Sequence, residues 1–277
     1  MLFLKPQAVI CLLCLCLSCV EKKQEKSFLS PKGYDLNKPL LVTLPLELDE
    51  ISGLSFYDKD STIFAISDDR GSIFKIKPNV GITKWKFSHG ADYEDITRID
   101  STFYVLQSNG DVIRVNYSGS TPQIRRFSFP DGKGYEFETL YYDSATKKIV
   151  LICKDCESDK KKQLSTFAFN PVTETFDSSF TIPVTKIDTL INEKKTKFKP
   201  SAAAIHPITG DLFIISSINK LLVIADNSGH AKEAYRLNPK LFKQPEGLTF
   251  NKKGDLVISN EFAENGTANL LIFKYNR

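Results

Sequence analysis

Gln244-Pro-Glu-Gly-Leu-Thr-Phe250 is one copy of a pattern that occurs five times in this chain of 277 residues. In each copy a polar or acidic pair precedes a small residue, and alternating apolar residues follow. Each copy then leads, through a turn or a polar pair, into a second apolar strand such as residues 256–258. Repetition of this kind indicates a repeat architecture built from one supersecondary unit. The other four copies are residues 50–56, 92–98, 136–142 and 199–205.

Each copy opens a longer unit of short strands. A third alternating strand, such as residues 72–76, and often a fourth, such as residues 82–87, follow the first two. Short strands this close together, without a helix-period segment between them, predict antiparallel meanders. Units of about 40 to 50 residues with four strands are typical of propeller blades. The sequence therefore predicts an all-β fold, a single β-propeller of five blades with four antiparallel strands each. Six blades is the alternative count, and a β-sandwich is the main competing architecture.

The two ends of the chain are expected to meet in one blade. The last unit has three clear strands before Arg277, and residues 40–44 form an orphan strand near the start. We expect this N-terminal strand to close the fifth blade, because the closure hides two sheet edges that would otherwise be open. Helical periodicity is weak throughout, and residues 187–197 are expected to form an insertion loop beside the fourth blade.

The composition agrees with one folded domain. Hydrophobic residues make up 42% of the chain and charged residues 25%, which excludes a disordered chain and a polytopic membrane protein. The 20 Phe and 10 Tyr residues favour strands. The net charge of +4 is spread along the chain and is too small to indicate nucleic-acid binding. We expect a monomer.

The first residues have the pattern of an export signal. Lys5 precedes an apolar run, residues 8–17, which is about half the roughly 20 residues that a bilayer-spanning helix needs. Ser18 and Cys19 then match the end of a bacterial lipoprotein signal, with an ordinary cleaved signal peptide as the alternative. Either signal places the protein in the bacterial cell envelope, and the first attaches it to a membrane by a lipid, facing the periplasm or the cell exterior. The predicted organisation is a signal peptide at 1–18, lipidated Cys19 and a flexible tether at 19–32, and the β-propeller domain at 33–277.

The repeated motif begins the innermost strand of each expected blade, so its polar positions should surround the central channel. The third motif position holds Glu94, Glu138 and Glu246 in three of the copies. Three carboxylates around a narrow channel repel one another and must protonate, stay hydrated or bind a cation. Oxygen ligands suit calcium best, so we expect a calcium ion near these three side chains. The alternative is that the motif carboxylates bind amides of neighbouring blades and set the blade spacing.

Two functions fit such a channel. One is a ligand- or protein-binding module of the cell envelope. The other is a metal-dependent hydrolase of a phosphoester, ester or lactone, in which Asp69 or Glu261 acts as the base beside the metal. His89, His206 and His230 are far apart in the repeat, so no catalytic triad is predicted. The residues expected to form the channel rim and bind the ligand are Glu50, Ser52, Asp68, Asp69, Asp92, Glu136, Ser201 and Glu261.

Cys153 and Cys156 form a C-x-x-C at the end of a second strand. A zinc site would need a second pair of ligands nearby, and the sequence offers none. In an oxidising compartment the simplest interpretation is a disulfide that holds an exposed loop, with free thiols as the alternative.

Four segments, in their order and spacing, resemble the SdiA-regulated family. The resemblance covers roughly residues 33–277 and implies a β-propeller exported to the cell envelope, often with an N-terminal anchor, but it implies no defined activity. More distantly the chain is similar to calcium-dependent propeller hydrolases such as gluconolactonases and phytase-like esterases, although it lacks their Asn and Asp ligand pattern and an evident catalytic His. The segments are Glu50-Ile-Ser-Gly-Leu54, Ala65-Ile-Ser-Asp-Asp69, Gln244-Pro-Glu-Gly-Leu248 and Val257-Ile-Ser-Asn-Glu261.

Overall fold

The structure is a computed structural model that describes residues 27–119, 121–130, 134–160, 162–262 and 267–276. The predicted signal peptide, residues 1–18, and the predicted lipidated Cys19 lie outside these ranges. Among the described helices, none combines the length and the apolar character that crossing a bilayer requires.

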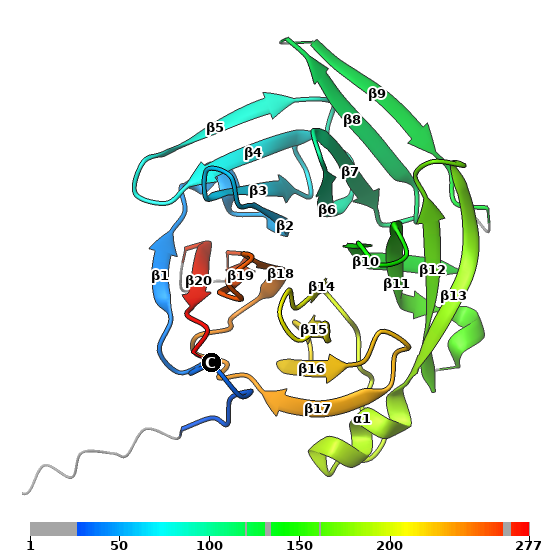
Figure 1. Ribbon diagram of the computed structural model, residues 1–277. Helices are drawn as coiled ribbons and strands as arrows, with labels where there is room; N and C mark the ends of the chain where they lie inside the picture. Colours follow the sequence, from blue (N-terminus) through cyan, green and yellow to red (C-terminus); the bar gives the residue numbers. More distant parts are fainter. Residues whose placement is uncertain (1–26, 120, 131–133, 161, 263–266, 277) are drawn as a thin grey trace, which may run out of the picture.

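Five antiparallel sheets of four strands are arranged in a ring around a common axis (Figure 1). This confirms the predicted all-β propeller and its count of five blades. In the first four blades the strands follow the chain from the axis outward. They are β2 (Ile51–Tyr57), β3 (Thr62–Ser67), β4 (Ser72–Lys77) and β5 (Gly81–Lys86); β6 (Tyr93–Ile99), β7 (Thr102–Gln107), β8 (Val112–Ser118) and β9 (Thr121–Phe127); β10 (Tyr135–Asp143), β11 (Lys148–Cys156), β12 (Gln163–Asn170) and β13 (Thr175–Pro183); β14 (Ala202–Ile205), β15 (Leu212–Ser216), β16 (Leu221–Ala225) and β17 (Ala231–Arg236).

The fifth blade joins the two ends of the described chain, as predicted. Its inner three strands come from the C-terminal part, and the N-terminal strand β1 pairs antiparallel with β20, for example Leu41 with Leu271. This pairing covers an edge that would otherwise be open to another chain. From the axis outward the strands are β18 (Pro245–Phe250), β19 (Leu256–Asn260), β20 (Asn269–Phe273) and β1 (Leu40–Thr43).

The core lies between the blades rather than inside one sheet. Successive side chains of a strand point to opposite faces. In β3, Ile63 and Ala65 pack against blade five, whereas Phe64 and Ile66 pack against blade two. Five such apolar clusters are present in the described residues. Each blade is therefore fixed by both of its neighbours, and the inner strands are held in a defined ring.

One segment differs from the sequence prediction. A helix, α1 (Val184–Ile191), follows β13 where a loop over residues 187–197 was expected. The prediction was wrong because the amphipathic pattern starts earlier, with Val184 and Ile187 both buried beside blade four. Asn192 ends the helix in the left-handed conformation, with a φ of 55°.

The inner strands approach one another closely at the axis. The buried Asp95 accepts a hydrogen bond from the backbone N–H of Leu140 in the next blade, at 2.8 Å. A Cβ atom at Gly53, in the preceding blade, would lie 1.9 Å from a carboxylate oxygen of Asp95. The small residue of the repeated motif is therefore required in blade one because the backbones meet there.

Tyr34, which precedes β1, connects blades four and five through contacts with the turns that follow their inner strands. The hydroxyl of Tyr34 donates to the carbonyl of Gly254 at 2.5 Å. Nδ1 of His206 accepts backbone hydrogen bonds from Ile208 and Thr209, so its Nε2–H donates to Tyr34 at 2.8 Å. Burial lowers the pKa of His206. This histidine is therefore a neutral structural residue.

Candidate cation site at the channel mouth

The five inner strands, β2, β6, β10, β14 and β18, surround the axis (Figure 1). Their C-terminal halves line one common cavity, so all five start at the opposite end of the axis. The polar motif positions gather at this end, together with residues that end the second strands of the blades. We call this group of residues the channel mouth. Its charged members are Glu50, Asp68, Asp92, Glu94, Glu136, Glu138, Lys154, Lys199, Glu246 and Glu261.

The three glutamates of the third motif position share one electrostatic environment. Burial, and then the charge of Glu138, raises the pKa of Glu94 to about 9. The same two causes raise the pKa of Glu246 to about 8. Burial also raises the pKa of Glu138. The charges of these side chains therefore act on one another, but within the described residues they do not form a group whose ligand atoms all lie within 4.8 Å of one another.

The ammonium group of Lys154 lies among these glutamates. Nζ of Lys154 lies 2.6 Å from a carboxylate oxygen of Glu136 and also forms an ion pair with Glu138. Burial alone would lower the pKa of Lys154, but the hydrogen bonds to Glu136 and Glu138 raise it above its usual range. Sequence reasoning missed Lys154, although its position at the end of β11, opposite the third motif copy, was a usable signal.

A different acidic group converges more tightly. Glu50, Asp68 and Glu261 each place one oxygen so that the three atoms lie within 4.8 Å of one another. Burial and a hydrogen bond with Glu50 raise the pKa of Glu261 to about 9, and burial and the charge of Glu50 raise the pKa of Asp68 to about 6. We call these three residues the acidic triad. They come from blades one and five, and all three were predicted as rim residues.

Neighbouring groups orient the acidic triad. Gln244 of the fifth motif copy donates a hydrogen bond to Glu261. One carboxylate oxygen of Asp68 is buried without a hydrogen-bond partner among the described residues. Asp69 instead accepts from the Ser67 hydroxyl at 2.9 Å and pairs with Arg70 at 3.3 Å. Asp69 is therefore held beside the triad by its own contacts, whereas Asp68 has an oxygen available to a ligand.

The two predicted serines hold blades together. Ser201 is buried, and its hydroxyl donates to the carbonyl of Pro245 in the next blade at 2.7 Å. The carbonyl of the buried Ser52 accepts from the Ser259 hydroxyl at 3.0 Å. The two contacts join neighbouring blades through hydroxyl donors, whereas the alternative named motif carboxylates that bind backbone amides, as Asp95 of the second motif copy does with Leu140.

Cys153 and Cys156 are joined by a disulfide. They lie with Asp159 in a compact group of possible metal ligands. Sulfur atoms in a disulfide are not thiolates, and Asp159 already accepts two hydrogen bonds from Ser165, so this group does not suit a metal.

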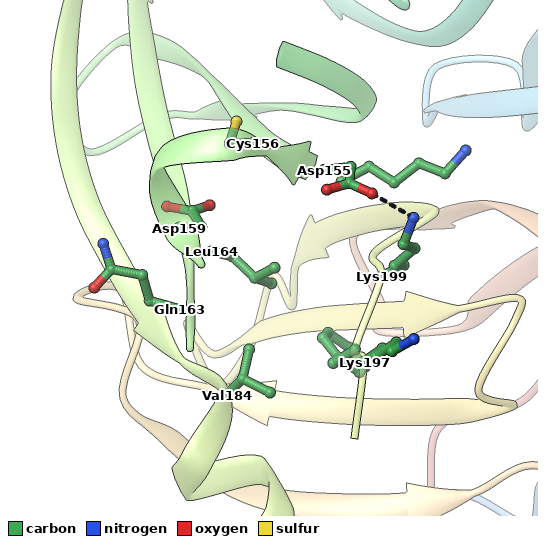
Figure 2. Close-up of a pocket in the computed structure, with 10 residues that line it drawn as sticks. Asp155, Cys156, Asp159, Gln163, Leu164, Val184, Lys197 and Lys199 are labelled. Atoms are coloured by element: carbon green, nitrogen blue, oxygen red, sulfur yellow. Dashed lines mark hydrogen bonds and ion pairs between the residues drawn. The ribbon is translucent and has the colours of Figure 1, made fainter. Parts of the chain in front are cut away.

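A small pocket adjoins the mouth between blades three and four (Figure 2). Its volume is about 130 Å³, and Lys154 and Lys199 are among its lining residues. Asp155 and Lys199 form an ion pair of 2.7 Å across its edge, drawn as a dashed line in Figure 2. Lys199 occupies the first motif position of blade four, where three other copies have an acid. The mouth is therefore acidic on the side of blades one, two and five and mixed on the side of blades three and four.

Comparisons with known proteins identify a family and a fold. The family model described as SdiA-regulated matches residues 41–263. No protein of curated function is recognisably similar in sequence. The solved structure of Myxococcus xanthus glutaminyl cyclase is 14% identical, with 87% of this chain and 100% of that chain covered and a TM-score of 0.54.

Two further solved structures are similar at the level of the fold. A luciferin-regenerating enzyme is 10% identical over 86% of this chain and 95% of that chain, with a TM-score of 0.51. A chain of a nidogen/laminin complex is 13% identical over 76% of this chain and 72% of that chain, with a TM-score of 0.51. At these identities the similarity concerns the propeller fold alone.

Proposed function

The chain belongs to the SdiA-regulated family, and from this premise we propose that it is an exported, lipid-anchored β-propeller that binds a divalent cation at its channel mouth. Calcium is the expected ion. In this proposal the loaded mouth is the surface on which a ligand or an envelope protein docks, so the molecule acts as a binding module.

One observation carries the proposal: the three carboxylates of the acidic triad converge within 4.8 Å. Calcium takes oxygen ligands at about 2.3 to 2.6 Å, so two ligands on opposite sides of one ion are about 5 Å apart. The unpartnered oxygen of Asp68 supplies a ligand atom that nothing else uses among the described residues. The triad therefore offers carboxylate oxygens at a spacing that one calcium ion can span, which supports the proposal.

We place the ion at the acidic triad rather than among Glu94, Glu138 and Glu246. Lys154 already supplies a positive charge to Glu138, and a second cation there would be repelled by its ammonium group. Glu246 lies beside this site, since its charge contributes to the raised pKa of Glu261.

Calorimetric titration of the purified protein with CaCl₂ at pH 8 tests the site. Glu261→Gln should weaken calcium binding at least tenfold, because it removes one of the three carboxylates. Glu47→Gln is the matched control, since Glu47 is partly exposed and pairs with Lys84 at 2.8 Å outside the mouth. Absence of calcium binding to the unmodified protein would refute the proposal. If Glu94→Gln loses calcium binding while Glu261→Gln binds calcium fully, the ion is bound by the three motif glutamates and not by the acidic triad.

A metal-dependent hydrolase is the second candidate, and one observation favours it. Glu261, one member of the acidic triad, has a pKa of about 9 and is protonated at neutral pH. In the hydrolase, Glu50 and Asp68 hold the ion and the protonated carboxyl of Glu261 acts as a general acid. A panel of ester, lactone and phosphomonoester substrates separates the two functions. Turnover that requires calcium and is lost in Glu261→Gln would establish the hydrolase, and calcium binding without turnover supports the binding module.

The proposed lipid anchor has its own test. Cells that express the full chain are grown with a radiolabelled fatty acid, and the label should be present in the protein and absent from the Cys19→Ser variant. Equal labelling of Cys19→Ser, or no labelling of either protein, would contradict the anchor.

A further inference from the structure

The end of the channel axis opposite the mouth carries the turns that follow the inner strands. Neighbouring strands of a blade are antiparallel, so the turns between third and fourth strands lie at the same end, and so does the start of β1. We call this end of the molecule the far face. Its turns include residues 58–61, 78–80, 100–101, 144–147, 171–174, 206–211, 226–230 and 251–255.

The described chain begins at the far face. The hydroxyl of Tyr34 donates to the carbonyl of Gly254, in the turn between β18 and β19. A backbone hydrogen bond also joins this segment to the chain that follows β20, beside which it lies in Figure 1. The backbone N–H of Phe28 donates to the side chain of Asn37 at 3.0 Å, so the first described residues lie on the same segment. The far face is therefore the end of the propeller from which the chain leads to Cys19.

The reach of the chain between Cys19 and Ser27 favours a membrane at the far face. Ser27 lies eight residues after Cys19, and an extended chain spans at most about 3.6 Å per residue, so the proposed lipid is within about 29 Å of Ser27. The strands of blades four and five have four to six residues, which corresponds to about 13 to 20 Å. If the mouth faced the membrane, passing along one of these blades would use about half or more of that reach. If the far face does, the propeller can lie directly on the surface.

Exposed aliphatic side chains are present at the far face. Val172, in the turn between β12 and β13, is 86% exposed, and Val80, in the turn between β4 and β5, is 75% exposed. Ile208 and Leu40 are also exposed at this end. The mouth end exposes apolar residues as well, Ile218 among them, so apolar character alone does not choose between the two ends.

Charge distinguishes the two ends. The channel mouth has eight carboxylates and two lysines. In or directly beside the turns of the far face, five exposed lysines and three carboxylates form no ion pair with another described residue. An anionic lipid surface attracts lysines and repels carboxylates, so it favours the far face over the mouth. The lysines are Lys59, Lys77, Lys147, Lys252 and Lys253, and the carboxylates are Asp58, Asp100 and Asp143.

We propose that the far face rests on the anionic lipid surface of the membrane that holds the anchor. This inference rests on the lipid anchor of the proposed function. The aliphatic side chains at the turn tips enter the headgroup region, and the lysines bind the phosphate groups of the lipids. The channel mouth then points away from the membrane, where a ligand or an envelope protein can reach it.

Lysine acetylation of the full lipidated chain tests this orientation. The protein is reconstituted into vesicles of phosphatidylcholine and phosphatidylglycerol without calcium, and flotation isolates the bound fraction. A reagent that does not cross membranes acetylates the lysines, and mass spectrometry measures the rates against protein in detergent micelles. Lys59 and Lys252 should react at least threefold more slowly on the vesicles. Lys160 and Lys197, which are exposed at the mouth end, should react at unchanged rates.

Acidic substitutions at the turn tips test the contact itself. The double variant Val80→Asp/Val172→Asp should lose most of the protection of Lys59 and Lys252, because the new carboxylates are repelled by the lipid phosphates. Ile218→Asp is the matched control, since it makes the same type of change at an exposed turn of the mouth end, and it should be protected like the unmodified protein. Thermal denaturation of each variant checks that it is folded.

The remaining outcomes separate this inference from its premise. Slower acetylation of Lys160 and Lys197 in place of Lys59 and Lys252 would put the mouth against the membrane and overturn the proposal. Unchanged rates at both ends of vesicle-bound protein would overturn it too, and so would equal loss of protection in Ile218→Asp. Protein that does not float with the vesicles would refute the lipid anchor, and the proposed orientation would fall with it.

Discussion

Nζ of Lys154 lies 2.6 Å from a carboxylate oxygen of Glu136, inside a channel mouth that the motif positions alone would make acidic. The two cysteines joined by the disulfide, Cys153 and Cys156, enclose Lys154 and Asp155. Lys154 pairs with glutamates of its own blade, whereas Asp155 pairs with Lys199 of blade four at 2.7 Å. The cross-linked end of β11 therefore contributes to the charge of the mouth and also joins two blades.

Replacing Lys154 should destabilise the protein in a pH-dependent way. Lys154→Gln removes the charge that offsets the repulsion between Glu136 and Glu138. We expect the free energy of unfolding at pH 8 to fall by about 2 kcal/mol, as for other hydrogen bonds between charged groups. At pH 5 the loss should be smaller, because the raised pKa of Glu138 makes protonation easier. Urea denaturation at both pH values measures the effect.

The matched control is Lys148→Gln. Lys148 lies in the same strand but pairs with Asp177 at 3.4 Å at an exposed site, so its loss should change stability by no more than about 0.5 kcal/mol. An equal effect of the two substitutions at pH 8 would show that Lys154 does not stabilise the mouth.

The raised pKa values predict that stability falls as the pH rises. The pKa of Glu94 is about 9 and that of Glu246 about 8 in the folded protein, above the usual value of 4.5. Between the usual pKa of 4.5 and the raised values, these two side chains keep their protons in the folded state but lose them in the unfolded state. The free energy of unfolding should therefore be greatest near pH 5 and decrease up to about pH 9. Denaturation at pH 5, 7 and 9 gives the slope.

Two comparisons identify the groups responsible. Glu94→Gln cannot titrate at this position and should show a shallower decrease, whereas Glu47→Gln should keep the slope of the unmodified protein. Calcium should offset the decrease at pH 9, because a bound cation replaces the protons that the acidic triad loses. Stability that rises from pH 5 to pH 9 without calcium would contradict the assigned shifts.

The serine of the fourth motif copy should contribute to the spacing of the blades. Ser201→Ala leaves the carbonyl of Pro245 without its donor at a buried site, which should cost about 1 to 2 kcal/mol of stability. Ser158→Ala, at an exposed position in the loop after β11, should be neutral within about 0.5 kcal/mol. Thermal denaturation compares the two variants. If they are equally stable, Ser201 does not have the structural role given to it here.

The alternation and repetition of apolar residues along the chain were enough to predict the blades. The acidic triad could not be predicted in this way, because it depends on which residues lie close together in the folded protein. Alternation of apolar residues fails to predict α1, because an eight-residue helix leaves a pattern too short to separate from a loop. The acidic triad combines Glu50 and Asp68 of blade one with Glu261 of blade five, and no single motif copy contains all three. Lys154 lies near the end of β11, where its direction depends on the irregular register between β10 and β11.

The sequence by itself determined the five-bladed ring, the closing strand and the end of the axis at which acids gather, because these follow from strand period and from repetition along the chain. Only the tertiary structure decided which carboxylates converge and that an ammonium group lies among the motif glutamates. The physical reason is that charges interact through distances in space. Residues 68 and 261 are neighbours only after the ring has closed, and the end of β11, between Cys153 and Cys156, directs Lys154 toward Glu136 and Glu138 only in the folded blade.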